Sequence, residues 1–325
     1  MLKKIYIVLL MTLCVPFSSI LAFSDNVIVG GENVGIMVKT KGVLVVGLYK
    51  VDNELIAAST NIKPGDYITK INNVSVNNIG DFSREINNDS DKESIDIEFK
   101  RGNKTYNTNL KLKKVDNDYK TGLYVKDTVS GIGTLTFIDP NTKTFGALGH
   151  QILESSSNNI LNINDGSIYH SYITGINKST NGKVGEKESL SEENKVYGDI
   201  KENTIRGIFG KYDNEIDNSK LTPVAKNNEI VLGGASILTV VSDDEVKEFK
   251  INIDKIDYND KTKNILFTIT DEELLSKTGG VVQGMSGSPI MQNGKLIGAV
   301  THAIVDDCKR GYGIFITNML EEADN

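Results

Sequence analysis

Residues that bind metals or form disulfides are scarce in this chain of 325 residues. It has 3 His and 2 Cys, and Cys14 and Cys308 lie in very different contexts, so neither a zinc cluster nor a disulfide framework can be assembled. Positive charge is not in excess either, because 36 Lys and Arg residues stand against 43 Asp and Glu residues. We therefore expect no metal, no cofactor and no nucleic-acid partner, since phosphate backbones are bound by a basic face.

Tryptophan is absent and proline is rare, with 5 Pro residues beside 30 Gly residues. This balance favours a β protein with many turns. The length corresponds to about two domains of ~150 residues each. We therefore expect a mainly β chain of two domains that packing stabilises.

The amino-terminal segment has the charged-then-apolar order of an export signal. Lys3 and Lys4 precede an uncharged run of 19 residues, 5–23. A run of this length can just span a bilayer, so a cleaved signal with Ala22 near the cut and a retained membrane anchor both stay open. We expect residues 1–24 to export the chain and, if they are retained, to tether it to a membrane.

Short strands separated by turn signals fill residues 27–114. A turn at 61–66 leads into a strand at 67–72, and a short helix is expected at about 80–87. Apolar and polar residues alternate over 95–99, as in a strand that is buried on one face. These patterns predict a small β domain with one short helix.

The order of these elements, and above all the run 62–72 (IKPGDYITKIN), resembles a PDZ domain. The resemblance implies that Gly42, Val43, Leu44 and Val45 form the carboxylate-binding loop and its following strand. Such a loop directs backbone N–H groups at a terminal carboxylate, and the exposed strand edge adds the peptide as an extra strand. We expect the carboxyl terminus of a peptide or protein as a partner there. A domain that acts only as a spacer or a regulatory clamp is the alternative.

Residues 115–325 hold many short strand candidates and little helical periodicity, which suits two antiparallel barrels. The polar stretch 178–203 is rich in Gly, Ser, Glu and Lys. We expect it to be a long loop or a crossing between the barrels.

The segment 283–289 (QGMSGSP) is typical of a nucleophile loop. Its glycines would leave the hydroxyl of Ser286 accessible, and the backbone N–H groups of Gly284 and Ser286 would converge on the oxygen that becomes negative in acyl transfer. Ser288 is the rival nucleophile, and a plain turn between two strands is the structural alternative. The segment predicts an oxyanion hole built from Gly284 and Ser286.

A serine nucleophile needs a base, and His150, His170 and His302 are the histidine candidates. His302 ends the strand that follows the nucleophile loop, where a double barrel holds the substrate, and the base comes from the other barrel. We therefore expect His150 as the base, His302 as a packed or supporting residue and His170 as an exposed side chain. A structural histidine at a strand end is the alternative for His150.

The sequence alone does not decide which acid would orient the base. The carboxylates between His150 and Ser286 include Asp165, Asp199, Asp254, Asp257 and Asp271. A solvated surface carboxylate is the default for each of them.

The longest specific pattern is carried by residues 270–290, 293–302 and 311–316, which together resemble the stage IV sporulation protein B peptidases. Residues 146–152, 198–200 and 207–210 fit the same family. The resemblance implies a PDZ domain at 27–114, followed at 115–325 by a chymotrypsin-like double β-barrel. It also implies Ser286 as nucleophile, His150 as base and Asp271 as the acid. The charged loop 306–310 departs from the family pattern.

The resemblance further implies a function. We expect an exported serine endopeptidase, tethered to a membrane or released between the forespore and mother-cell membranes. Its substrate would be an extracytoplasmic segment of a membrane protein, and cleavage would activate a mother-cell sigma-factor pathway during spore formation. A catalytically silent PDZ scaffold of a membrane complex and a general quality-control protease for exported proteins are the alternatives.

Overall fold

The structure is a computed structural model that describes residues 24–88, 93–155 and 157–324. The expected export segment therefore lies outside the described residues, apart from Ser24. Within the described ranges no helix is long and apolar enough to cross a membrane.

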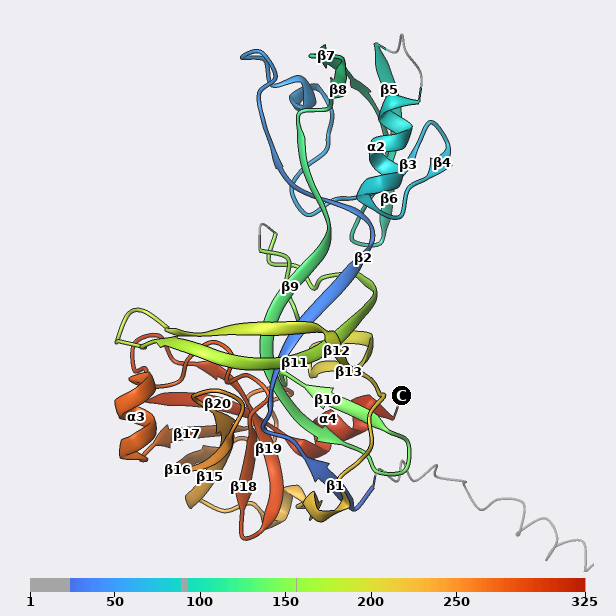
Figure 1. Cartoon of the computed structure of the whole chain (residues 1–325). Helices are drawn as coiled ribbons and strands as arrows, with labels where there is room; N and C mark the ends of the chain where they lie inside the picture. The colour runs from blue at the N-terminus through green and yellow to red at the C-terminus, as the bar shows by residue number, and fades with distance from the viewer. Residues whose placement is uncertain (1–23, 89–92, 156, 325) are drawn as a thin grey trace, which may run out of the picture.

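The described elements fall into three groups. A small β domain, at the top of Figure 1, contains η1 Ile56–Ser59, β3 Tyr67–Ile71, β4 Val74–Ser75, α2 Ile79–Asn87, β5 Ser94–Arg101, β6 Lys104–Lys111, β7 Lys113–Val115 and β8 Asp118–Lys120. A first barrel and its edge contain β1 Asn26–Val29, β2 Asn33–Leu48, β9 Leu123–Ile138, β10 Thr144–Ala147, β11 Ile163–Asn177, β12 Glu186–Thr204, β13 Gly207–Tyr212, η2 Asn218–Lys220 and β14 Leu221–Pro223. A second barrel contains η3 Asn227–Glu229, β15 Gly233–Val240, β16 Val246–Ile256, β17 Ile265–Ile269, α3 Glu272–Thr278, β18 Pro289–Gln292, β19 Lys295–Ala303, β20 Arg310–Phe315 and α4 Ile316–Ala323.

Both barrels close through antiparallel pairing. In the first, the strands follow the order β9-β10-β13-β12-β11-β2, and the pairing of β2 with β9 closes the ring. In the second, the order is β15-β16-β17-β20-β19-β18. Residues along a strand point alternately inward and outward, so each barrel fills its interior with its own apolar side chains. The mainly β prediction with a double barrel is confirmed.

The strands β2 and β9 run side by side out of the first barrel and into the small β domain (Figure 1). Residues 33–40 of β2 pair with β11 and with residues 128–134 of β9, inside the barrel. Beyond Gly42, residues 43–48 pair with β3 and with residues 123–126 of β9. Gly42 has φ +96°, and a Cβ there would lie 2.6 Å from the Ile68 carbonyl oxygen, so only glycine fits this change of partner.

The strand pairing does not divide the chain into two consecutive domains at residues 114 and 115, as the sequence predicts. Residues 26–40 precede the small β domain in sequence, yet their hydrogen bonds place them in the first barrel. The small β domain is therefore an insertion carried on two long strands. A local pattern of alternation could not reveal this, because it does not say which strands pair.

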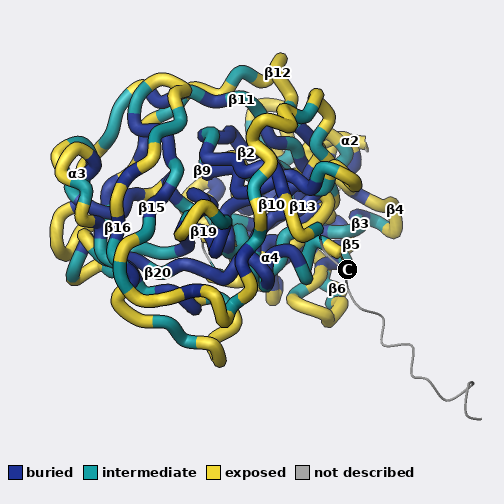
Figure 2. Tube along the Cα trace, turned by 90° about the horizontal axis from the view of Figure 1, so that it is seen from below, coloured by how far each residue is buried: buried dark blue, intermediate teal, exposed yellow. Residues whose placement is uncertain are grey.

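The polar stretch 178–203 is mostly a strand and not the long loop that the sequence predicts. Most of it is β12, which pairs with β11 on one side and β13 on the other. Most of its residues are exposed, as the burial colours along the trace in Figure 2 indicate. The strand therefore lacks the apolar alternation that marks a strand in a sequence.

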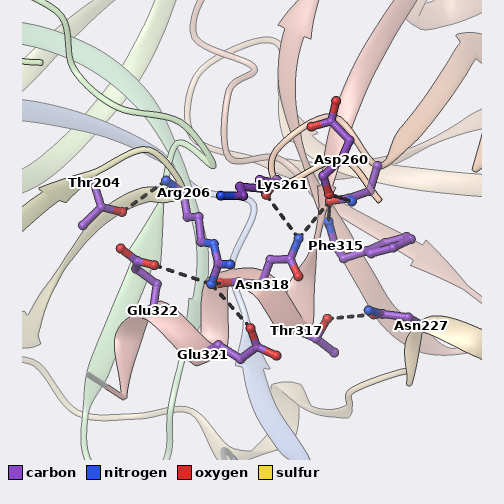
Figure 3. Close-up of polar contacts among 11 residues, drawn as sticks. Thr204, Arg206, Asn227, Asp260, Lys261, Phe315, Thr317, Asn318, Glu321 and Glu322 are labelled. Carbon is purple, nitrogen blue, oxygen red and sulfur yellow. Dashed lines mark hydrogen bonds and ion pairs between the residues drawn. The ribbon is translucent and has the colours of Figure 1, made fainter. Parts of the chain in front are cut away.

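Helix α4 ties the two barrels together (Figure 3). Arg206, in the turn between β12 and β13, donates to the Asn318 carbonyl oxygen at 3.1 Å and pairs with Glu321 at 3.4 Å. Asn318 donates to the side-chain oxygen of Asn264 in the second barrel at 3.0 Å. Beside these contacts, an apolar cluster shared by the barrels includes Phe137, Phe209, Leu296, Ile314 and Met319. The two barrels are thus held as one body around the cleft described next.

Candidate active site

A pocket of about 490 Å³ lies where the two barrels meet. Its lining comes from both barrels and is mostly apolar; it comprises Ile36, Val129, Ser130, Gly131, Ile132, Leu148, His150, Gln151, Ile152, Leu153, Val184, Val281, Val282, Gln283, Gly284, Ser286, Thr301, His302 and Ala303. Among the residues that the structure describes, no Asp, Glu, Lys or Arg lines this pocket. It contains three of the four residues predicted for catalysis and the oxyanion hole.

The backbone of the nucleophile loop 283–288 is almost fully paired. The N–H groups of Gln283, Met285, Gly287 and Ser288 each donate to a carbonyl oxygen at 2.8–3.1 Å. Those of Gly284 and Ser286 have no partner in the part of the chain that the structure describes. Buried N–H groups are seldom left unpaired, so two in one loop that line a pocket are suited to bind an anionic oxygen. They are the two donors that the sequence predicts.

Strand β9 holds this loop from the first barrel. The Thr134 N–H donates to the Ser286 carbonyl oxygen at 2.9 Å. The Thr134 hydroxyl donates to the Gly284 carbonyl oxygen at 2.8 Å. The Thr136 hydroxyl donates to the Gly287 carbonyl oxygen at 2.8 Å. Gly287 has φ +92°, and a Cβ there would lie 2.1 Å from the Thr134 carbonyl oxygen. The close approach of β9 therefore requires glycine after the serine.

The two serines of the loop have different environments. Ser286 is partly exposed in the pocket, and its hydroxyl donates to the Thr301 carbonyl oxygen at 2.9 Å. Ser288 is fully buried behind the loop, where its hydroxyl bonds Thr239 at 3.1 Å. A buried hydroxyl cannot reach a substrate, so Ser286 is the nucleophile candidate.

His150 follows β10 and faces the same pocket. Its Nδ1 lies 2.8 Å from the carbonyl oxygen of Gln151, which only accepts, so Nδ1 carries the proton and Nε2 keeps its lone pair. Ser286 bonds Thr301 and not His150, so the hydroxyl must turn from Thr301 before Nε2 can take its proton. A backbone carbonyl thus does the orienting work that an acid does in a Ser-His-Asp group.

The pKa of His150 is lowered from its ordinary value of 6.5, because burial disfavours the imidazolium and the bond to Gln151 offsets this only in part. The histidine is therefore neutral, and able to act as a base, to lower pH than a free imidazole. We expect kcat/KM for a peptide to fall on the acid side with a midpoint below pH 6.5, measured in a buffer of constant ionic strength. A midpoint above about pH 7 would contradict the geometry, because it would require a carboxylate partner that raises the pKa.

His302 lies beside the base, with its ring centroid 5.1 Å from that of His150. Burial and the neighbouring His150 lower the pKa of His302 to about 4. Its Nδ1 is buried with no hydrogen-bond partner among the described residues. It is therefore a neutral side chain in the pocket wall. His170 is elsewhere, on β11, where its Nδ1 lies 2.6 Å from Glu192; it is partly buried, not exposed as expected.

Asp271 is not at the pocket. It follows β17 and caps α3, the helix at the outer edge of the second barrel in Figure 1. Its carboxylate accepts from the N–H of Leu274 at 3.0 Å and from that of Lys250 at 3.3 Å. Burial and the Gln151 carbonyl are the causes that shift the His150 pKa, with no carboxylate among them. The structure therefore does not bring Asp271 to the imidazole, and its role as the acid stays a prediction from the resemblance. Asp165, Asp199, Asp254 and Asp257 do not line the pocket either.

The cap at α3 makes its own prediction. Replacing an Asp cap by Ala leaves the first helical N–H groups unpaired, so Asp271→Ala is expected to lower the free energy of unfolding by about 1 kcal/mol. Asn caps as well as Asp, so Asp271→Asn is the control and should keep nearly full stability. Urea unfolding of the three proteins measures this. An Ala variant as stable as the wild type would show that the cap contributes nothing.

The predicted peptide site in the small β domain is already paired on both sides. Val43 and Leu44 pair with β3 on one edge, and Leu44 and Val45 pair with residues 125–126 of β9 on the other. A peptide can extend a sheet only at a free edge. The strand that follows Gly42 therefore offers no edge unless β9 moves away.

Several residues of the site carry no signal in the sequence. Thr134, Thr136 and Thr301 are threonines in strands, and Gln151 contributes only its carbonyl. They act through contacts between segments that are far apart in the chain. Only a structure brings such segments together.

A double β-barrel with a serine, a neutral histidine and two unpaired N–H groups in one interbarrel pocket defines a chymotrypsin-like serine peptidase. A family model described as SpoIVB peptidase S55 matches residues 117–320, and a PDZ domain model matches residues 33–112. The chain therefore belongs to the SpoIVB peptidase S55 family and is a serine peptidase. The match begins after the PDZ domain, although β1 and half of β2 complete the same barrel.

Solved structures resemble parts of the chain. The PDZ domain of the SdrC-like protein of Listeria monocytogenes is 24% identical, covers 27% of this chain and 90% of its own, and has a TM-score of 0.23. The Rv3671c protease of M. tuberculosis is 15% identical in its inactive form, covering 58% of this chain and 80% of its own with a TM-score of 0.34. In its active form the same protease is 14% identical, covers 58% of this chain and 71% of its own, and has a TM-score of 0.32. No curated protein matches the chain.

Proposed function

We propose that this serine peptidase cleaves an extracytoplasmic segment of a membrane protein during spore formation, and that the cleavage activates a mother-cell sigma-factor pathway. Family membership supports the setting, since the matching model is that of the SpoIVB peptidases. The charged-then-apolar order of residues 1–24 supports export and a membrane tether. The observation that carries the peptidase chemistry is the pair of unpaired N–H groups, of Gly284 and Ser286, in the pocket that also holds the Ser286 hydroxyl and His150.

The chemistry is acyl transfer. The Ser286 oxygen attacks the scissile carbonyl carbon while its proton passes to Nε2 of His150, and the carbonyl oxygen becomes an anion between the N–H groups of Gly284 and Ser286. The C–N bond then breaks, and His150 gives its proton to the leaving amine. Water repeats the sequence on the acyl-serine and releases the carboxylate product. Burial lowers the pKa of His150 from its ordinary value, which favours this return of the proton.

The pocket wall predicts the kind of side chain that is accepted. Val281, Val282 and Ala303 line it together with Ser286, and in the described part of the chain no charged residue does. A charged side chain would lose its hydration there without gaining a partner. We expect peptides with an apolar residue before the scissile bond to be cleaved at least ~10-fold faster, in kcat/KM, than the same peptides with Lys or Glu there. A peptide library analysed by mass spectrometry measures this; equal cleavage after charged residues would contradict it.

The sporulation role is tested in cells that carry Ser286→Ala on the chromosome. We expect the mother-cell sigma-factor reporter to stay silent and the membrane-protein substrate to remain uncut, although the protein accumulates normally. Full reporter activity in that strain would instead support a silent PDZ scaffold. Broad cleavage of casein by the purified wild type, with heat sensitivity of the mutant outside sporulation, would support a quality-control protease.

The PDZ domain is proposed to control the peptidase, as well as to recognise a carboxyl terminus. Control of the peptidase is supported by strand β9, which connects the two parts. Its residues 123–126 pair with β2 in the PDZ domain, and its Thr134 and Thr136 hold the nucleophile loop. A ligand that displaced residues 123–126 from β2 would therefore act on the strand that fixes Ser286 and Gly284. A spacer would need no such shared strand.

A further inference from the structure

The segment 279–284 joins α3 to the nucleophile loop and belongs to no strand of the second barrel. It carries Val281 and Val282 of the pocket wall and Gly284 of the oxyanion hole. Its own barrel holds its first half: the Val281 N–H donates to the Cys308 carbonyl oxygen at 2.8 Å, the Cys308 thiol donates to the Gly279 carbonyl oxygen at 3.4 Å, and the Thr278 hydroxyl donates to the Gly280 carbonyl oxygen at 2.7 Å. From the first barrel, Thr134 of β9 bonds the Gly284 carbonyl oxygen. Further bonds from the first barrel are made by the tip of the β11–β12 hairpin, residues 178–187, which we call the arm tip.

Ser179 makes hydrogen bonds both within the arm tip and to residues 278–281, and its side chain is buried. Its hydroxyl donates to the Val281 carbonyl oxygen at 2.7 Å and accepts from the Gly185 N–H at 2.8 Å. Its own N–H donates to the Thr278 carbonyl oxygen at 2.8 Å. One side chain thus joins both strands of the arm tip to the pocket wall.

The arm tip also sets the direction of the Gly284 N–H. The Lys187 N–H donates to the Gln283 carbonyl oxygen at 2.9 Å, and the Gln283 N–H donates to the Gly185 carbonyl oxygen at 2.8 Å. A trans peptide unit carries its C=O and N–H on opposite sides. Fixing the Gln283 carbonyl toward β12 therefore turns the Gly284 N–H the other way, toward the pocket.

We propose that Ser179 is a positioning residue for the oxyanion hole, and that the arm tip must be docked on residues 279–284 for the peptidase to cleave. The inference rests on Ser286 acting as the nucleophile, and it adds the element that prepares its oxyanion donor. Loss of the Ser179 hydroxyl leaves the Val281 carbonyl oxygen and the Gly185 N–H buried and unpaired, so the segment shifts. An undocked arm would leave the serine in place and the Gly284 donor misdirected.

The test compares Ser179→Ala with Ser179→Thr and Ser189→Ala in the full chain. Thr keeps a γ-hydroxyl, and Ser189 is a matched control, because its hydroxyl lies buried on β12, just beyond the arm tip, with no partner among the described residues. We expect Ser179→Ala to lower kcat about 10-fold or more per titrated active site. The affinity for a peptidyl boronic acid, whose oxygen occupies the oxyanion hole, should fall with kcat. Ser179→Thr should recover most of both, and Ser189→Ala should change neither.

Two results would overturn the proposal. One is a Ser179→Ala protein that melts at a lower temperature but keeps its kcat and its boronic acid affinity per folded molecule, since that is a structural role alone. The other is equal loss of kcat in Ser179→Ala and Ser189→Ala, which would make the effect unspecific. Ser286→Ala in the same assay distinguishes a failure of the nucleophile assignment from a failure of the arm-tip proposal. If Ser286→Ala still cleaves, the proposed nucleophile fails, and if it alone is inactive, only the arm proposal fails.

Discussion

Ser286→Ala is expected to lower kcat for peptide cleavage by roughly 10⁴- to 10⁶-fold, as removal of a serine nucleophile does in other serine peptidases. The structure leaves no substitute, because Ser288 is fully buried and no other serine of the loop reaches the pocket in the part of the chain that is described. The measurement is the turnover of a purified chain with a short fluorogenic peptide that has an apolar residue before the scissile bond.

Ser288→Ala is the matched control, since it removes a hydroxyl two positions along the same loop. It is expected to retain cleavage, because that hydroxyl bonds Thr239 behind the loop and does not face the pocket. The reverse pattern, with turnover kept in Ser286→Ala and lost in Ser288→Ala, would mean that the loop presents the other serine.

Lys187→Met is expected to raise the free energy of unfolding by a few kcal/mol at pH 7. Burial lowers the pKa of Lys187 from 10.5 to about 7, and its amine has one hydrogen bond, to the Thr239 hydroxyl at 2.9 Å. At about 1.4 kcal/mol per pKa unit, the buried amine costs up to about 5 kcal/mol relative to the unfolded chain. Met keeps the length of the stem that packs against Gly284, and the lost bond to Thr239 offsets about 1 kcal/mol.

The pH dependence has a definite sign. The lowered pKa means that the unfolded chain binds more protons than the folded one between pH 7 and 10.5, so stability of the wild type rises with pH over that window. The advantage of the Met variant is therefore full below pH 7 and should shrink to less than half by about pH 9.5. Chemical unfolding at both pH values measures it, with Lys183→Met, an exposed lysine of the arm tip, as control. A Met variant less stable than the wild type at pH 7 would show that the amine is charged and well paired.

Much of the fold could be predicted from the sequence, because strands that are buried on one face alternate visibly. The helix expected at about 80–87 is α2, Ile79–Asn87, and the alternation over 95–99 is β5. The strand β12 was not predicted, since both its faces are mostly polar and its pairing is with distant segments. The shared strands β2 and β9 were missed for the same reason, as a sequence does not record which strands are neighbours.

The site shows the same division. Ser286, Gly284 and His150 stand in local motifs, and the structure brings them to one pocket. Asp271 was inferred from a resemblance, whereas the structure uses its carboxylate to cap α3. Ser179 and Thr134 carry no motif, because their function depends on hydrogen bonds to residues 281 and 284–286 across the barrel interface.

The most direct test is a crystal structure of the chain inactivated by a peptidyl diphenyl phosphonate with an apolar side chain next to phosphorus. We expect the phosphorus to be bonded to the Ser286 oxygen, with its anionic oxygen within about 3 Å of the N–H groups of both Gly284 and Ser286. Nε2 of His150 should face the Ser286 oxygen, and the apolar side chain should lie against Val281 and Val282. A phosphonate bound to another residue, or an adduct whose anionic oxygen points away from these two N–H groups, would contradict the proposed catalytic site.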